Sequence, residues 1–272
     1  MSATYENIVV EKDDGVTWLS LNRPEKRNAM SPQLHYEMDD ALRWLAHDKD
    51  TRVLILTGKG QAFCAGQDLK LYFRETQNNP EERARAQQAS NSWRWHRIVN
   101  FPKPTIAMVN GPCFGGAFTA VCACDIALAA DEATFGLSEV NWGVIPGGIV
   151  SWNIAEMLSH RDAMFYAMTG LPFDGRKAAE IKLVNYSVPL ADLREETLKI
   201  ARILQEKNPF TLRYTKEAVR HVRGMSHDQA YNFLAAKLQA LQHVDKEGGM
   251  QKGMSQFLDD KSYKPGFGAF KP

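Results

Sequence analysis

The stretch PTIAMVNGPCFGGAFTAVCACDIALAAD, from Pro104 to Asp131, contains two short apolar runs separated by a glycine-containing segment. The first run, TIAMVNG, ends in glycine, and both runs have the length and composition of buried strands. The segment between them, from Phe114 towards Cys124, has the character of a helix. Because a strand, a helix and a further strand follow one another here, the stretch predicts an α/β fold.

The same alternation continues on both sides of this stretch. VTWLSLN follows a DDG turn at residues 13–15, which predicts a β-hairpin. Ser31 and Pro32 open a helix, since serine is a good N-cap and proline a good first helical residue. VLILTG (residues 53–58) and ATFGL (residues 133–137) are further strands, and helices are expected over residues 80–99 and after residue 148.

Strand patterns are absent after about residue 195. The remaining segments, LREETLKIARILQEKN, TLRYTKEAVRHVRG and SHDQAYNFLAAKLQALQHV, are all helical in pattern. We therefore expect an α/β core over residues 1–195 and a helical C-terminal segment over residues 196–272.

The overall composition is that of an ordinary globular protein. The chain has 272 residues, 44% of them apolar and 24% charged, with a formal net charge of +1. This balance argues against a dedicated nucleic-acid binder. No apolar run approaches the roughly 18 residues of a membrane span. The N-terminus lacks the basic start and apolar core of a secretory signal, so we expect a cytoplasmic protein.

Several common functional motifs are absent or incomplete. GLPFDGRK (residues 170–177) imitates a phosphate loop, but it has arginine where that loop needs lysine. There is no dinucleotide-binding glycine motif, no nucleophile elbow and no HExxH pair. The cysteines form no C-x-x-C pair and are expected to be reduced and buried; they are Cys64, Cys113, Cys122 and Cys124.

A basic stripe on one helix leaves two interpretations open. It consists of Arg213, Lys216, Arg220 and Arg223. A solvated helix face is the simpler interpretation. The alternative is contact with an anion, either a phosphate-bearing cofactor or a nucleic acid.

Two glycine-containing loops each follow a predicted buried strand. FCAGQDLK (residues 63–70) follows VLILTG, and CFGGAF (residues 113–118) follows TIAMVNG. Such junctions direct free backbone N–H groups outward, and two of them side by side could converge on one oxygen atom as an oxyanion hole. Tight turns without a function are an equally good interpretation of the spacing alone.

One glutamate stands out among apolar residues. Glu139 lies in FGLSEVNWGVIPGG, residues 135–148. Burial there would raise the pKa of its carboxyl group, which suits a general acid/base. An exposed loop glutamate is the more common case.

The three segments AFCAGQDL, NGPCFGGAF and ADEATFGLSEVNWGVIPG together resemble the crotonase, or enoyl-CoA hydratase/isomerase, superfamily. The resemblance runs from about Leu19 to the C-terminus. It implies a crotonase-like spiral of ββα units carrying the CoA site, then a helical segment that builds trimers or dimers of trimers. It also implies an acyl-CoA substrate whose thioester oxygen is bound by the amides of Gln67 and Gly116. A side chain at Gly116 would then obstruct the thioester.

Residue 119 departs from the simple hydratases of this superfamily. These enzymes carry two glutamates, one at the position of Glu139 and one at the position of Thr119. A hydroxyl cannot act as an acid/base near neutral pH as a carboxylate can, although it can hold a water or a substrate hydroxyl. The resemblance therefore favours a reaction that uses a single carboxylate.

A closer resemblance is to the hydroxycinnamoyl-CoA hydratase-lyases, through RPEKRNAMSP, DLKLYFRE, KPTIAMVNG, FGLSEVNWG and QFLDDKSYKPG. It implies hydration of feruloyl-CoA or p-coumaroyl-CoA, then retro-aldol cleavage to an aromatic aldehyde (vanillin or 4-hydroxybenzaldehyde) and acetyl-CoA. Glu139 would be the acid/base, and Gln67, Gly116 and Thr119 would complete the catalytic set. No metal or redox cofactor is implied, and CoA enters as part of the substrate.

The same resemblance implies a set of binding residues. CoA would be held by Lys26 and by Ala65, Gly66, Gln67, Asp68, Leu69 and Lys70. Ser138 and Trp142 would flank Glu139, and Tyr72 would meet the phenolic hydroxyl. The second phenol-binding tyrosine of the hydratase-lyases aligns with Ala235. Tyr231 lies one helical turn earlier on the same face, so two interpretations stay open: Tyr231 replaces that tyrosine, or the ring is recognised differently.

Two other functions are compatible with parts of this pattern. An enoyl-CoA isomerase, or a hydratase of a non-phenolic acyl-CoA, would use the same oxyanion hole, and isomerases also work with one glutamate. A crotonase-fold scaffold that binds RNA through the basic stripe would belong to a different class. The near-neutral charge and the set of Gln67, Gly116 and Glu139 argue against the scaffold.

Overall fold

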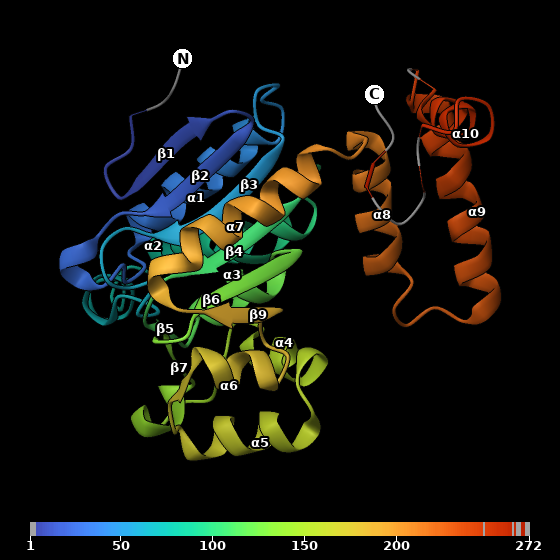
Figure 1. The fold of residues 1–272 in the computed structure, drawn as a ribbon. Helices are drawn as coiled ribbons and strands as arrows, with labels where there is room; N and C mark the ends of the chain where they lie inside the picture. Colours follow the sequence, from blue (N-terminus) through green and yellow to red (C-terminus); the bar gives the residue numbers. More distant parts are fainter. Residues whose placement is uncertain (1–3, 247, 263, 265–267, 270–272) are drawn as a thin grey trace.

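The computed structural model describes residues 4–246, 248–262, 264 and 268–269. A six-stranded sheet, with strand order β1-β2-β3-β4-β6-β9, forms the centre of the fold (Figure 1). Only β1 and β2 are antiparallel, and the other neighbours are parallel. Its strands are β1 (Ile8–Asp13), β2 (Val16–Leu21), β3 (Val53–Gly58), β4 (Thr105–Val109), β6 (Ile126–Ala130) and β9 (Tyr186–Val188).

A second, smaller sheet has the order β5-β7-β8. Its strands are β5 (Cys113–Phe114), β7 (Thr134–Gly136) and β8 (Phe173–Asp174). The pairing of β5 with β7 explains why the predicted helix at Phe114 begins three residues later than expected, as α3 (Ala117–Ala123). The α/β prediction and the predicted strands and N-terminal hairpin are confirmed.

The helices predicted at Pro32 and at residue 80 begin at those residues. Ser31 caps α1, accepting a hydrogen bond of 3.2 Å from the N–H of Leu34. The helices of the core are α1 (Pro32–Leu45), α2 (Pro80–Asn91), α3, α4 (Val150–Met157), α5 (His160–Thr169), α6 (Gly175–Glu180) and α7 (Leu190–Gln205). Short turns of other helix types are η1 (Pro24–Lys26), η2 (Leu69–Arg74), η3 (Ser92–Arg97) and η4 (Ser138–Trp142), of which η2 and η3 are π-helical.

The phosphate-loop imitation has an ordinary structural role. Gly170 ends α5 in the left-handed conformation, and the Asp174 carboxylate caps α6 by accepting from the N–H of Lys177 at 2.8 Å. These residues therefore form a helix end, a short strand and a helix start.

The C-terminal helices stand beside the sheet rather than on it (Figure 1). They are α8 (Pro209–His221), α9 (His227–Val244) and α10 (Gly249–Leu258). Residue 195 lies inside α7, which packs on β4, β6 and β9. The separate helical part thus starts with α8, and the role of residues 196–272 in self-association stays a prediction.

Three residues of the basic stripe, Arg213, Lys216 and Arg220, lie on α8, whereas Arg223 lies in the turn that follows it. All four pair with acidic side chains of the same chain. Lys216 and Arg220 each contact the carboxylate of Asp125 at 2.8 Å. Arg213 pairs with Glu217 at 3.0 Å, and Arg223 lies 3.5 Å from Glu156. The stripe is thus partly an anchor of α8 on the core rather than a wholly solvated face.

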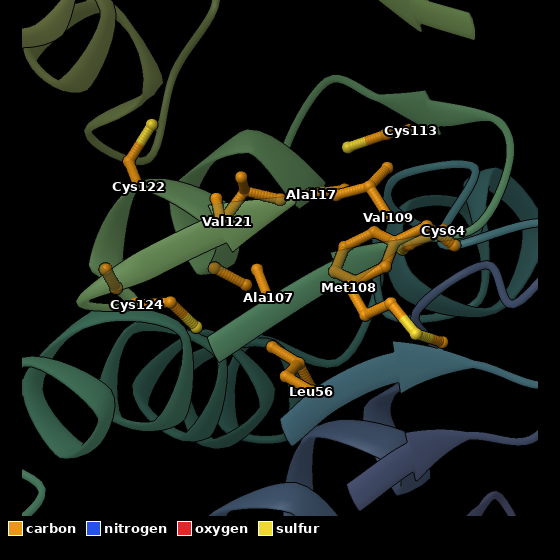
Figure 2. Packing of buried hydrophobic residues seen from close by; sticks show 14 of the residues in the cluster. Leu56, Cys64, Ala107, Met108, Val109, Cys113, Ala117, Val121, Cys122 and Cys124 are labelled. Atoms are coloured by element: carbon orange, nitrogen blue, oxygen red, sulfur yellow. The ribbon is translucent and has the colours of Figure 1, made fainter. Parts of the chain in front are cut away.

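All four cysteines are free and buried, as predicted. Figure 2 shows Cys113, Cys122 and Cys124 near the apolar side chains of β4 and α3. Burial raises the pKa of each thiol, to about 12 for Cys64, Cys122 and Cys124. These thiols therefore act as small apolar groups of the core.

Candidate active site

The two glycine-containing loops lie side by side. They follow β3 and β4, which are parallel neighbours, so both loops leave the same edge of the sheet. The N–H of Cys64 donates to the carbonyl of Pro112, and the N–H of Phe114 donates to the carbonyl of Cys64, both at 3.0 Å. The expected juxtaposition of the loops is therefore present.

Glycine permits this close approach. Gly66 has a φ of +92°, and a Cβ there would lie 3.1 Å from the carbonyl oxygen of Phe114. Within the described residues, neither the N–H of Gln67 nor that of Gly116 has a hydrogen-bond acceptor. Gly116 also precedes α3, whose N-terminus adds a partial positive charge. Two free donors on adjacent loops are the requirement for an oxyanion hole.

The carboxyl group of Glu139 lies beside the second of these loops, at Gly115. It is carried by η4, the turn that follows β7, and β7 pairs with β5 directly before Gly115. A Cβ on Gly115 would lie 2.9 Å from its Oε1. Its Oε2 is buried without a partner in the described structure, and burial raises the pKa of this carboxyl group. Glu139 is thus a partly buried carboxylate and not an exposed loop residue.

Thr119 lies in the first turn of α3 and is buried. Its hydroxyl donates to the carbonyl of Gly148 at 3.4 Å, a long hydrogen bond. This position lies one helical turn after Gly116, so the hydroxyl faces the segment that follows Glu139. It can hold a polar group but supplies no second carboxylate.

Tyr72 is held in the π-helical turn η2 and is almost fully buried. Its ring makes edge contacts with His35 at 5.4 Å and Phe73 at 5.1 Å between centroids. The pKa of its phenol is raised, chiefly by burial, while Arg94 and Ser90 act in the opposite direction. Tyr72 is therefore a neutral hydroxyl near neutral pH.

Asp68 has an internal role in the loop that leads to Tyr72. Its carboxylate accepts from the N–H groups of Lys70 and Leu71 and pairs with Arg23 at 2.9 Å. Both hydrogen bonds and the arginine keep its pKa below the usual range, against the effect of burial. This side chain shapes the loop, which leaves its backbone for any contact with CoA.

Most other predicted binding residues surround these loops. Ala65 donates its N–H to the carbonyl of Arg27, next to the exposed Lys26. Leu69 and Lys70 are exposed at the start of η2, and Ser138 is half-buried next to Glu139. The Trp142 side chain is 68% exposed. The binding roles of these residues stay predictions.

Tyr231 lies apart from this cluster. It is on α9, 69% exposed, and α9 packs chiefly against α8 within the chain (Figure 1). Within one chain, the structure therefore does not bring Tyr231 to the loops or to Tyr72.

The chain as a whole matches one family model. The model describes enoyl-CoA hydratase/isomerase, and it covers residues 11–267. The chain belongs to the enoyl-CoA hydratase/isomerase family. This confirms the resemblance inferred from the three segments, and with it the crotonase-like fold.

Other members of the family resemble the chain over almost its full length. It is 51% identical to a hydroxycinnamoyl-CoA hydratase-lyase from Pseudomonas fluorescens, over 99% of both chains. It is 33% identical to a putative enoyl-CoA hydratase from Thermus thermophilus, over 93% of this chain and 98% of the relative. Among solved structures, an enoyl-CoA hydratase from Bacillus anthracis has a TM-score of 0.84 at 29% identity, over 93% of this chain and 96% of that one.

Four buried polar residues near the loops were not identified from the sequence alone. They are His35, Ser90, Trp93 and Arg94. The last three recur at positions i, i+3 and i+4 of the helix predicted over residues 80–99, a spacing that places them on one face. The spacing of a serine, an indole and a guanidinium on one face of this helix was the available signal.

Among the described residues, no group of three or more His, Cys, Asp or Glu side chains is placed to hold a metal ion. No described helix is long and apolar enough to cross a membrane.

Proposed function

We propose that the chain hydrates 4-hydroxycinnamoyl-CoA thioesters, such as feruloyl-CoA and p-coumaroyl-CoA, and then cleaves the product to an aromatic aldehyde and acetyl-CoA. The observation that carries this proposal is the 51% identity, over 99% of both chains, to a protein named hydroxycinnamoyl-CoA hydratase-lyase. The site supports it, since one partly buried carboxylate lies beside Gly115, and the two adjacent loops carry N–H groups without an acceptor in the described residues. Thr119 stands where a plain hydratase has its second glutamate.

In the hydration stage, Glu139 acts as a base and then as an acid. Its carboxylate takes a proton from water as the water oxygen attacks the β-carbon. The electron pair of the double bond passes to the thioester oxygen, and the N–H groups of Gln67 and Gly116 stabilise the resulting enolate. Glu139 then returns the proton to the α-carbon, which leaves the β-hydroxy thioester.

In the cleavage stage the same groups act again. Glu139 removes the proton of the β-hydroxyl, the aldehyde C=O forms, and the bond between the α- and β-carbons breaks. The electron pair of this bond becomes the enolate of acetyl-CoA, and Glu139 protonates its α-carbon. Because both stages pass through a thioester enolate, one oxyanion hole serves both; the loss of one such donor typically costs about 10²–10³ in rate.

The remaining predicted residues would bind and orient the substrate. Lys26 and residues 65–70 would hold CoA, and Tyr72 would donate to, or accept from, the phenolic hydroxyl. Ser138 and Trp142 would flank the reacting carbons, and Thr119 would hold the water or the β-hydroxyl. Tyr231 would reach a phenol only from a neighbouring subunit.

We also infer self-association as a trimer or a dimer of trimers. The C-terminal helices leave large apolar side chains exposed, which supports an interface between copies. These side chains are Leu234 and Leu238 on α9 and Met250, Met254 and Phe257 on α10.

The test compares feruloyl-CoA with crotonyl-CoA. Vanillin and acetyl-CoA in equal amounts from feruloyl-CoA, abolished in Glu139→Ala, would support the proposal. Hydration of crotonyl-CoA with feruloyl-CoA left intact would contradict it. That result would favour the alternative, an isomerase or hydratase of a non-phenolic acyl-CoA.

A further inference from the structure

One buried helix face touches both loops of the proposed oxyanion hole. Ser90 lies in the last turn of α2, and Trp93 and Arg94 follow in η3, so the three residues lie at positions i, i+3 and i+4. All three are buried. A π-helical turn such as η3 is rare and is frequently found at functional sites. The face carries a hydroxyl, an indole N–H and a guanidinium, each of which needs a partner inside the protein.

The first loop is held through His35 and the side chain of Gln67. The indole N–H of Trp93 donates to Nδ1 of His35 at 2.8 Å. His35 is fully buried, and burial lowers its pKa to about 3, so the imidazole is neutral at physiological pH. Since Nδ1 accepts, the proton is on Nε2, and this N–H donates to Oε1 of Gln67 at 2.8 Å.

The amide of Gln67 is thereby fixed at both ends. Its Nε2 donates to the hydroxyl oxygen of Ser90 at 3.3 Å. The backbone on either side of Gln67 is held by Met30. The N–H of Met30 donates to the carbonyl of Gly66 at 2.8 Å, and the N–H of Asp68 donates to the carbonyl of Met30 at 3.0 Å. In the described part of the chain, the backbone N–H of Gln67 has no acceptor, and it is the group proposed to face the thioester oxygen.

The second loop is held by Arg94. Its Nη1 donates to the carbonyl of Gly116 at 2.9 Å, and its Nε donates to the carbonyl of Ser90 at 3.2 Å. Within the described residues, no carboxylate pairs with this guanidinium. Burying an unpaired arginine is unfavourable, and burial does lower its pKa. An apolar side chain at this position would cost less free energy to bury. The arginine therefore indicates that its hydrogen bond to the carbonyl of Gly116 is needed.

We propose that Ser90, Trp93 and Arg94, with His35, are positioning residues that hold the N–H groups of Gln67 and Gly116 in register for one oxygen atom. The inference rests on the proposed function, in which these N–H groups bind the thioester enolate. The helix face joins two loops that are distant in sequence, one at Gln67 and one at Gly116. A shift of either loop would spoil the convergence of the two donors.

The test uses Trp93→Phe, which removes the indole N–H, and Arg94→Met, which removes the bond to Gly116. Trp95→Phe is the matched control, because Trp95 lies on the same turn but packs on Trp152 and takes no part in the network. We expect kcat to fall about tenfold or more in the first two variants, less than the loss of a whole donor. KM should stay within about twofold, because the donors act mainly on the enolate. The control should keep wild-type kinetics.

A spectroscopic measurement separates positioning from folding. In a Glu139→Gln background, which should not turn over, bound cinnamoyl-CoA should absorb at longer wavelength than free cinnamoyl-CoA, because the donors polarise its thioester. Trp93→Phe and Arg94→Met should reduce this shift. If both variants lose thermal stability but keep kcat and the full shift, the network is structural only and the inference is wrong.

Further variants and the wild type separate a failure to fold from a failure of the proposed function. Should Trp93→Phe not fold, Ser90→Ala and His35→Gln address the same loop and carry the same expectation. A wild type that neither cleaves feruloyl-CoA nor shifts the absorbance of any bound enoyl thioester would refute the oxyanion hole itself. A wild type that does both, with unaffected variants, would refute the positioning role alone.

Discussion

The carboxyl group of Glu139 occupies the space that a side chain on Gly115 would need. A Cβ on Gly115 would lie 2.9 Å from Oε1 of Glu139 and 3.4 Å from its carboxyl carbon. The residue also has a φ of +52°, a conformation that costs about 1–2 kcal/mol for residues with a side chain. The glycine next to the proposed oxyanion donor is thus the one that makes room for the proposed acid/base.

We therefore expect Gly115→Ala to displace the Glu139 carboxylate and to lower kcat by at least tenfold. Gly224→Ala is the matched control, since Gly224 has a φ of +83° but nothing lies within 4 Å of a Cβ placed there. Both variants should lose similar stability through backbone strain, and only the first should lose activity. Equal loss of activity in the two variants would contradict this view.

The raised pKa of Glu139 predicts the acid limb of the pH–rate profile. Hydration starts with the ionised carboxylate, and burial raises the pKa of this group above the ordinary glutamate value of 4.5. We expect kcat/KM to fall with decreasing pH at a midpoint above 4.5. The profile of kcat/KM for feruloyl-CoA from pH 4 to pH 8 measures this midpoint, and one at or below the ordinary value would show that the carboxyl group is solvated.

The raised pKa of Glu139 also predicts how the stability of the folded protein depends on pH. A carboxyl whose pKa is higher in the folded state favours folding while it is protonated, and this contribution is lost as the pH rises through the folded-state pKa. At neutral pH the buried charge is therefore a cost, and Glu139→Gln should unfold at a temperature equal to or above that of the wild type. The difference should shrink towards pH 4. Thermal unfolding of both proteins over this range provides the check, and a variant less stable at pH 7 would argue against the desolvation.

The elements that build the site could be predicted from local patterns. Apolar runs ending in glycine indicated β3 and β4, and their parallel order implied that the loops after them share an edge. The family resemblance then assigned roles to Gln67, Gly116 and Glu139. Local pattern was sufficient for the two buried strands within residues 104–131. The short strand β5 in the same stretch was not predicted, because it depends on pairing with β7.

The buried polar network could not be predicted in this way. His35 and Gln67 are 32 positions apart, and nothing in either segment shows that their side chains meet. Likewise, the sequence suggested that a side chain at Gly116 would obstruct the thioester, whereas in the structure a Cβ there would lie 2.7 Å from Nη1 of Arg94. Such contacts depend on the packing of elements that are distant in sequence. Asp125, which pairs with two cations of α8, is another case.

Tyr72 decides between a phenolic and a non-phenolic substrate. If its hydroxyl contacts the substrate phenol, Tyr72→Phe loses one hydrogen bond, worth about 1 kcal/mol, and kcat/KM for feruloyl-CoA should fall about fivefold to tenfold. Any slow turnover of crotonyl-CoA should stay within about twofold, because that substrate has no ring. Tyr186→Phe is a suitable control, since Tyr186 lies on β9 at the far edge of the sheet. A fall with both substrates would mean that the hydroxyl supports the loop through its hydrogen bond with Ser90, and no change with either would exclude the phenol contact.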